Sequence, residues 1–359
     1  MRTSKIISFI FPHHSPEPAG GYKVVYEYAN RLVADGHKVN IVYSGSLFWK
    51  KKSLYFKLTN CFRYIQMLMH GYSCRKWFNL DKRVKEQLTF SLNYRHVPKS
   101  DIYICTSPYT AMYVKDYPTD NKYYFIQGYE NWGAVTDEKL RETYHYPLKK
   151  IVISKWLKEI IEKEESEKCT LIYNGFDFNY FKLRTPIKEK KRYKVAMVYS
   201  PLEIKGCKYG FEALKIVKQV FPQLQVTMFG SAPRPSDLPE WYTYHIRPDK
   251  ELHNAIYNEA AIFLAPSLQE GWGLTIGEAM ICGQAVVCTN NRGYKEMASD
   301  RINSLMCNIK NSKSLAENII KLISDDDLRN SIAERGMKDI QKFNIEKSFL
   351  QLKSTLKLS

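Results

Sequence analysis

The stretch APSLQEGWGLTIGEAMICGQAVV occupies residues 265–287 and indicates how the chain folds. The apolar run that ends at residue 265 predicts a buried strand, residues 275–282 predict a helix, and residues 285–288 predict another strand. A strand, a helix and a second strand in this order are typical of a parallel sheet. Gly271 and Gly273 lie in the loop before the helix, where they leave the backbone amides accessible.

This loop has the features of a site for a sugar next to an anion. The start of the helix offers free N–H groups to a phosphate. Glu270 and Glu278 do not suit a phosphate but do suit neutral hydroxyls, so we expect a sugar and a ribose beside a diphosphate. In the structural alternative, Glu270 caps the helix and Glu278 faces solvent. That alternative does not explain the two glycines or Trp272.

The length of 359 residues predicts two domains, because a single core rarely grows beyond about 250 to 300 residues. Strand-like and helix-like runs alternate before residue 173 and again after residue 195, which favours α/β folding with two Rossmann-like doubly wound domains. We place the domains at residues 1–182 and 183–340, and a C-terminal helix within residues 341–359 that crosses back to the first domain. Strands are expected at residues 5–11, 39–43, 102–105, 123–126, 150–153, 171–173, 195–199, 226–229, 262–265 and 285–288. Helices are expected at residues 22–35, 155–167, 209–220, 250–258, 275–282, 314–323 and 345–356.

The composition is that of a folded protein without a membrane span. Hydrophobic residues make up 44% of the chain, but no run approaches the roughly 18 apolar residues that a span needs. The apolar run at residues 6–11 ends at Pro12 without a cleavage site, so we do not expect a secretory signal. Eight scattered cysteines without a C-x-x-C pair argue for reduced thiols in the cytoplasm and against structural zinc.

Positive charge is concentrated in one segment of a chain whose formal net charge is +17. Residues 47–99 contain twelve lysines and arginines but only Asp81 and Glu86 as acidic residues, a net charge of +10. Many aromatic and aliphatic residues lie between these charges, a mixture that suits an anionic membrane surface or another polyanion. An amphipathic helix with its apolar side in the core has the same pattern, and the sequence leaves both readings open.

Two further loops follow predicted strands, where doubly wound domains bind ligands. Gly20 and Gly21 follow the first strand and allow a ligand to approach the backbone, although glycine pairs often form ordinary turns. Lys205 and Gly206 follow the first strand of the second domain, where a lysine can place a positive charge on a diphosphate. The alternative is a surface lysine before a flexible turn. Residues 325–327, DDD, imitate a metal-binding motif, but we interpret them as a polar turn between helices.

The motifs resemble those of family 4 glycosyltransferases, which are retaining enzymes of the GT-B fold. The two glutamates of PSLQEGWGLTIGEAM are separated by seven residues, as in that family. Matching segments elsewhere, in the same order, are GGYKVVYEYANRLVADGHKVNIV, KKIVISKWL, LIYNGFDFNYF and RGYKEM. The resemblance therefore extends over nearly the whole chain.

The resemblance implies a role for each residue that matches the family motifs. Glu270 would bind hydroxyls of the donor sugar, Glu278 would hold the ribose, and Lys205 would bind the diphosphate. Ser200 stands where relatives commonly carry an arginine, and many relatives have a histidine in place of Gln127. The remaining implied contacts are Gly271, Trp272, Gly273 and Leu274 for the sugar and diphosphate, Gly20 and Gly21 for the phosphates, and Gln127, Tyr129 and Glu130 for the sugar or acceptor. Spacing alone suggests His245, Ile246 and Arg247 for the nucleotide base.

The expected reaction moves a hexose-type sugar from a nucleoside-diphosphate sugar to a polysaccharide or lipid-linked oligosaccharide in cell-surface glycan synthesis. Lys205 and Glu270 would be the catalytic residues, because fixed positive charge stabilises the departing diphosphate. We expect no metal and no further cofactor, and a peripheral position at the cytosolic face of an anionic membrane. The alternatives are a GT-B epimerase or phosphorylase, or a nucleic-acid-binding protein that uses the basic segment.

Overall fold

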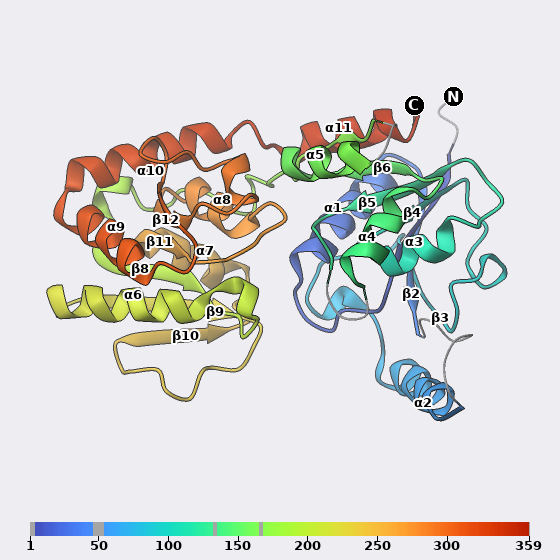
Figure 1. Cartoon of the computed structure of the whole chain (residues 1–359), viewed down its shortest axis with the longest axis horizontal. Coiled ribbons are helices and arrows are strands. Elements are labelled where there is room, and N and C mark those ends of the chain that lie inside the picture. The colour runs from blue at the N-terminus through green and yellow to red at the C-terminus, as the bar shows by residue number, and fades with distance from the viewer. Residues whose placement is uncertain (1–3, 46–53, 132–134, 165–167, 359) are drawn as a thin grey trace. The chain divides into compact units, whose positions relative to one another are not determined.

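The computed structural model describes residues 4–45, 54–131, 135–164 and 168–358 (Figure 1). The chain forms two compact units, one of Met1–Tyr173 with Ser348–Ser359 and the other of Asn174–Lys347. The units divide ahead of residues 182 and 183, where the change in composition suggested a boundary. The reason is that Phe176 pairs with the end of the second unit: its N–H donates to the Phe343 carbonyl (2.9 Å) and its own carbonyl accepts from Ile345 N–H (3.1 Å).

The first unit contains a seven-stranded parallel sheet in the order β3-β2-β1-β4-β5-β6-β7. Its strands are β1 (Ile6–Phe11), β2 (Lys38–Ser44), β3 (Lys85–Thr89), β4 (Ile102–Cys105), β5 (Lys122–Ile126), β6 (Lys149–Val152) and β7 (Thr170–Leu171). Its helices include α1 (Gly20–Ala34), α2 (Leu54–His70), α3 (Pro108–Val114), α4 (Asp137–Tyr144) and α5 (Lys155–Glu164). The predicted helix at residues 155–167 extends in part beyond the described residues. The sequence did not predict β3, whose first residues are polar or charged.

The second unit contains a six-stranded parallel sheet in the order β10-β9-β8-β11-β12-β13. Its strands are β8 (Lys191–Val198), β9 (Gln225–Gly230), β10 (Tyr242–Ile246), β11 (Ala260–Ala265), β12 (Ala285–Thr289) and β13 (Leu305–Cys307). Its helices are α6 (Cys207–Val220), α7 (Lys250–Glu259), α8 (Leu274–Ile281), α9 (Ser312–Ser324) and α10 (Asp326–Ile340). The expectation of two parallel α/β domains is confirmed.

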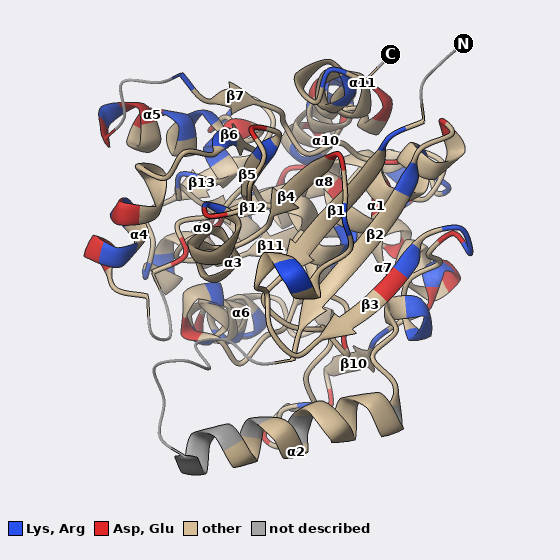
Figure 2. Ribbon diagram, turned by 90° about the vertical axis from the view of Figure 1, so that its right-hand side faces the viewer, with Lys and Arg blue, Asp and Glu red and all other residues tan. Residues whose placement is uncertain are grey.

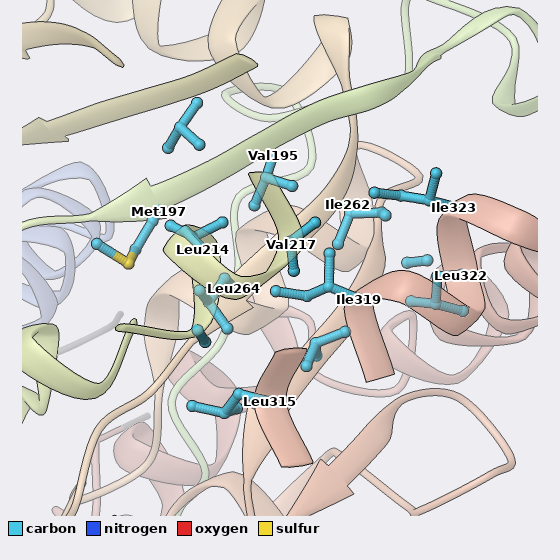
Figure 3. Close-up of a cluster of buried hydrophobic side chains, with 14 of the residues drawn as sticks. Val195, Met197, Leu214, Val217, Ile262, Leu264, Leu315, Ile319, Leu322 and Ile323 are labelled. Carbon is cyan, nitrogen blue, oxygen red and sulfur yellow. The ribbon is translucent and has the colours of Figure 1, made fainter. Parts of the chain in front are cut away.

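Apolar side chains of the second unit form one core around its central strands. Figure 3 shows Leu214 and Val217 of α6 and Ile319 of α9 against Val195 of β8 and Ile262 of β11. All five side chains are fully buried. Their burial holds the central strands β8 and β11, whose following loops contain Lys205 and Glu270.

The basic segment at residues 47–99 has two parts with different environments. From residue 73 onward it belongs to the core of the first unit, because β3 pairs with β2 and Leu80, Val84 and Leu88 are buried. The helix α2, by contrast, lies apart from the strands (Figure 2). The segment therefore contributes to the core from residue 73 onward, and the membrane reading stays a prediction for α2.

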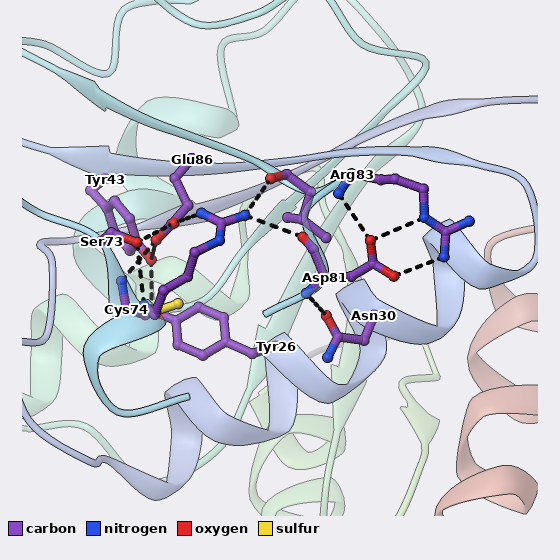
Figure 4. Close-up of polar contacts among 10 residues, drawn as sticks. Tyr26, Asn30, Tyr43, Ser73, Cys74, Asp81, Arg83 and Glu86 are labelled. Atoms are coloured by element: carbon purple, nitrogen blue, oxygen red, sulfur yellow. Dashed lines mark hydrogen bonds and ion pairs between the residues drawn. The ribbon is translucent and has the colours of Figure 1, made fainter. Parts of the chain in front are cut away.

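A buried carboxylate joins the start of this core part to β3 (Figure 4). Glu86 of β3 accepts hydrogen bonds from Ser73 Oγ (2.6 Å) and Cys74 N–H (2.9 Å), and it forms an ion pair with Arg75. Tyr43 of β2 donates a further hydrogen bond at 3.3 Å. A buried charge is stable only when it is paired and hydrogen-bonded, and Glu86 meets both conditions.

The last helix, α11 (Ile345–Thr355), returns the chain to the first unit. Within that unit Lys353 Nζ lies 2.5 Å from Asp35 Oδ2, and the Tyr123 hydroxyl donates to the Thr355 carbonyl at 3.2 Å. These contacts agree with the expected GT-B arrangement, in which the C-terminal helix crosses back.

The acidic run at residues 325–327 begins a helix, and the prediction of a polar turn is wrong. Asp325 caps α10 by accepting the Leu328 N–H at 2.9 Å, and Asp326 pairs with Arg329 at 2.6 Å. Acidic residues stabilise a helix N-terminus, which accounts for the run. Among the residues that the structure describes, no three His, Cys, Asp or Glu side chains gather as a metal site would require. No helix in the described ranges is both long and apolar enough to span a bilayer.

We predict that Glu86→Ala lowers the free energy of unfolding by about 3 kcal/mol, because it leaves Arg75 and three hydrogen-bond donors without their acceptor. Urea denaturation measures the change. Glu251→Ala is the control, since its ion pair with Arg184 is exposed to solvent and should contribute little to stability. Equal losses of unfolding free energy in the two variants would show that the contacts of Glu86 do not stabilise the attachment of β3.

Candidate functional site

Each sheet reverses its strand order at one point, and the loops at that point define where a ligand is expected. The reversal lies between β8 and β11 in the second unit and between β1 and β4 in the first. The connections on the two sides of the reversal cover opposite faces of the sheet, which leaves a crevice at the carboxyl ends of these strands.

Lys205 and Glu270 meet at the reversal point of the second unit. Lys205 ends the short helix Glu203–Lys205 after β8, and Glu270 lies in the loop after β11. Lys205 Nζ is 2.8 Å from Glu270 Oε1, and the side chains are 35% and 14% exposed. A partly exposed ion pair of this kind contributes at most about 1 kcal/mol, so a charged ligand can replace either partner at low cost.

The two loops that carry this pair are in direct backbone contact. Leu268 N–H donates to the Ile204 carbonyl at 2.8 Å. Gly206 has a φ of +61°, and a Cβ there would lie 2.2 Å from the Pro266 carbonyl oxygen. Only glycine fits this conformation and this spacing, so the turn after Lys205 is held in one conformation rather than flexible.

A hydrogen-bond network fixes the carboxylate of Glu270. Ser267 Oγ donates to Glu270 Oε1 at 2.8 Å and accepts from the Tyr294 hydroxyl at 3.1 Å. Asn291 Nδ2 donates to the Ser267 carbonyl at 3.1 Å, and Thr289 Oγ1 donates to the same carbonyl. None of these four residues was predicted to have a role, although Ser267 and Tyr294 lie in motifs that resemble those of the family.

The N-terminus of α8 lies next to this pair and has no side-chain cap. Gly273 is the N-cap with a φ of +102°, and as a glycine it provides no side-chain acceptor for the first turn. The Tyr294 ring would lie 2.5 Å from a Cβ at Gly273, so this position also requires glycine. Glu270 does not cap the helix, and the structural alternative for Glu270 is therefore wrong.

Glu278 lies inside the second unit. It is 6% exposed, and its Oε2 accepts a hydrogen bond from the Tyr257 hydroxyl at 3.0 Å. Burial, and then the nearby Glu278 carboxylate, raise the pKa of Tyr257 well above its usual value, so this phenol stays protonated and donates. The reading of Glu278 as a solvent-facing residue is wrong.

Trp272 anchors the loop to the core instead of lining its surface. Its side chain is 2% exposed, and its ring packs on Phe176 (5.2 Å between centroids) and Phe343 (5.1 Å). The indole therefore supports the loop from the core, and a donor contact of this residue would involve its backbone amide. The backbone amides of Gly271, Trp272, Gly273 and Leu274 stay a prediction.

The other residues expected in the second unit lie in two places. Ser200 follows β8, and its Oγ accepts the Leu202 N–H at 3.3 Å, so it shapes the turn that leads to Lys205. His245 and Ile246 end β10, and Arg247 follows with a φ of +48°. They share the carboxyl edge of the sheet with Lys205, but β9 lies between β10 and β8.

In the first unit the structure brings Gly21 and Gln127 together. Gly20 and Gly21 are the first residues of α1, whose N-cap Ala19 provides no side-chain acceptor. Gln127 follows β5 and donates its Nε2–H to the Gly21 carbonyl at 3.1 Å. A Cβ at Gly21 would lie 3.2 Å from Gln127 Nε2, which leaves little space for a side chain.

Tyr129 and Glu130 follow in the same loop. Tyr129 hydrogen-bonds to Arg141 of α4 and raises the pKa of that arginine. Burial raises the pKa of Glu130 to about 8, and the Glu130 carboxylate in turn adds to the raised pKa of Tyr22. Glu130 is thus a carboxyl group that can exchange a proton near neutral pH.

The sequence of the second unit is similar to known glycosyltransferases. Residues 181–339 match the family model described as Glycosyl transferases group 1. The chain is 32% identical over 111 residues to O-antigen chain mannosyltransferase B of Escherichia coli, a match to 31% of this chain and 28% of that protein. It is 34% identical over 83 residues to N,N'-diacetylbacillosaminyl-diphospho-undecaprenol alpha-1,3-N-acetylgalactosaminyltransferase of Campylobacter jejuni, a match to 23% and 22%. The chain thus spans about a quarter of the length of these curated relatives.

The fold of the whole chain is similar to that of solved structures. HepE of Anabaena, in complex with UDP-glucose, has a TM-score of 0.72 at 17% sequence identity. This likeness covers 98% of the chain and 99% of HepE. The second unit is therefore similar in sequence to the glycosyl transferases group 1 family, and the chain has the GT-B fold.

Proposed function

We propose that this protein is a retaining glycosyltransferase of family 4 that moves a hexose-type sugar from a nucleoside-diphosphate sugar to a polysaccharide or lipid-linked oligosaccharide. The observation that carries the proposal is the Lys205–Glu270 pair beside the uncapped N-terminus of α8. All of these groups lie within the segment that matches the family model.

The pair places the two halves of a donor next to each other. Lys205 and the N–H groups of α8 supply positive charge for the diphosphate, and Glu270 accepts hydrogen bonds from sugar hydroxyls. Because Lys205 Nζ and Glu270 Oε1 lie 2.8 Å apart, a donor that engages both residues has its diphosphate and its sugar side by side. Glu278, oriented by Tyr257, accepts hydrogen bonds from the ribose hydroxyls.

The chemistry follows from the charges that develop when the donor breaks. The bond between the anomeric carbon and the phosphate oxygen breaks, so the diphosphate gains negative charge and the sugar gains positive character. Lys205 and α8 stabilise the departing diphosphate without a metal ion. The acceptor hydroxyl attacks the same face of the sugar and gives its proton to the departing phosphate oxygen, which retains the anomeric configuration. Glu270, held by Ser267, orients the sugar throughout.

The relatives suggest the chemical class of donor and acceptor. HepE was solved with UDP and with UDP-glucose, so uridine nucleotides are the first donors to test. The names of the two curated relatives refer to an O-antigen chain and to a diphospho-undecaprenol. These names support a glycan or lipid-linked acceptor, and with it a peripheral position at the cytosolic face of a membrane.

We predict that one of UDP, GDP or dTDP, or its sugar, raises the melting temperature of the protein, because a ligand that binds only the folded state stabilises it. A hundredfold excess over Kd corresponds to about 2.7 kcal/mol. Differential scanning fluorimetry compares the nucleotides. RNA and DNA are the controls, and stabilisation by these in place of every nucleotide would exclude the transferase.

We predict that Lys205→Ala and Glu270→Ala each lower the transfer rate by about 100-fold or more, because each removes a charge from the donor site. Product formation from the stabilising donor is the measurement. Lys208→Ala and Glu203→Ala are matched controls. Glu203 lies on the same short helix as Lys205 and Lys208 lies in the first turn of α6, but their side chains are 77% and 59% exposed. A variant of Lys205 or Glu270 with full activity would remove that residue from the mechanism.

We predict that Glu130 makes the protein less stable as the pH rises. The folded state raises its pKa from 4.5 to about 8, so it favours the protonated form. The resulting stabilisation is complete below pH 4.5 and is lost as the pH rises through 8. When the pH is raised from about 5 to about 9, the melting temperature of the wild type should therefore fall more than that of Glu130→Gln, which has no proton to release. An equal loss in both proteins would contradict a raised pKa.

A further inference from the structure

The helix α2 exposes a row of large apolar side chains that no function proposed so far explains. Leu58, Phe62, Ile65, Leu68 and Met69 are between 49% and 77% exposed. Their spacing of three and four residues places them on one side of the helix. Soluble proteins seldom expose a contiguous apolar patch of this kind unless another surface covers it.

The opposite side of α2 is attached to the first unit, which determines the direction of this apolar face. The ring of Tyr64 packs edge-on against Phe90, with 5.4 Å between centroids. Gly45 is also close to this ring, since a Cβ there would lie 2.3 Å from it. Gly45 follows β2 and Phe90 follows β3, so α2 is attached at the carboxyl edge of the sheet.

The charge around α2 identifies the chemistry of its partner. The helix sequence LYFKLTNCFRYIQMLMH contains Lys57 and Arg63 but no acidic residue. Lys50, Lys51 and Lys52 precede it in the sequence and lie outside the described residues. The two acidic residues of the 47–99 segment are paired with Arg83 and Arg75, so they do not neutralise these lysines. A second copy of the chain would bring the same positive charge and be repelled, whereas an anionic surface is attracted.

We propose that α2 lies in the headgroup region of an anionic lipid bilayer, with Leu58, Phe62, Ile65, Leu68 and Met69 toward the acyl chains. A helix with one apolar face and basic residues binds a bilayer in this orientation. Because the strands are parallel, α2 is at the same edge of the sheet as the loops that carry Gly21 and Gln127. The bilayer would therefore deliver a lipid-linked acceptor to that edge, a step that rests on the proposed function.

Vesicle flotation tests the docking surface without any need for activity. The full-length protein should float with vesicles of phosphatidylcholine and phosphatidylglycerol, and more weakly with phosphatidylcholine alone or at high salt. Leu58→Gln should weaken binding about tenfold, and Leu58→Gln with Phe62→Gln by about 100-fold. Leu350→Gln is the matched control: Leu350 of α11 is 62% exposed, as are Leu58 and Phe62, and its loss should not change binding. Reversal of Lys50, Lys51 and Lys52 to Glu should weaken binding to the anionic vesicles.

Three results would overturn the proposal. The first is a wild type that does not float, and the second is a Leu58→Gln variant that binds as the wild type does. The third is light scattering that shows a dimer lost in Leu58→Gln, which would assign the face to a second copy. Stabilisation by nucleotides, measured on the same variants, separates the two proposals. If nucleotides stabilise none of these proteins, the donor site is rejected and docking is unaffected. If nucleotides still stabilise Leu58→Gln and this variant no longer floats, docking is a property separate from donor binding.

Discussion

Parallel pairing of the strands is the constraint on which the candidate site depends. Two neighbouring parallel strands need a crossover connection, so every strand of a sheet ends at the same edge. The loops that follow β8 and β11 are therefore neighbours, although a long stretch of sequence separates them. Lys205 and Glu270 form a contact of 2.8 Å across a separation of 65 residues. The strand order therefore brings these two loops together, and the side chains on the loops then provide the chemistry.

A second feature of the site is that backbone contacts and hydrogen bonds hold its groups in place. Gly206 and Gly273 allow backbone contacts that a Cβ would prevent, and both have positive φ. The Glu270 carboxylate is fixed by Ser267, which is held in turn by Tyr294 and Asn291. A site whose groups are already oriented loses little entropy when a substrate binds, and it stabilises charge without having to reorganise.

Most of the fold could be predicted from the sequence because its central strands have continuous apolar runs. The strands β3, β10 and β13 escaped prediction, and each lies at an edge of its sheet. An edge strand is paired on one side only and carries more polar residues, as in KEQLT of β3, so its apolar pattern is weak.

For the candidate site, the sequence indicated the loops but not the burial of their side chains. The motifs pointed to the loops of Lys205 and Glu270, whose side chains are in contact in the structure. Charged residues next to glycines after a strand have few structural explanations, which is why these loops stood out. The burial of Trp272 and Glu278 could not be read from the same motif. It depends on Phe176, Phe343 and Tyr257, which approach from other parts of the chain. Packing between distant segments is not encoded in local spacing.

The return of α11 also determines the order in which the chain can fold during synthesis. The first unit is discontinuous, because the second unit is inserted between Tyr173 and Ser348. As the polypeptide leaves the ribosome, residues 174–347 emerge as one uninterrupted segment. The contacts of Lys353 with Asp35 and of Thr355 with Tyr123 must wait for the last part of the chain. The unit that is translated first is thus the last to be completed.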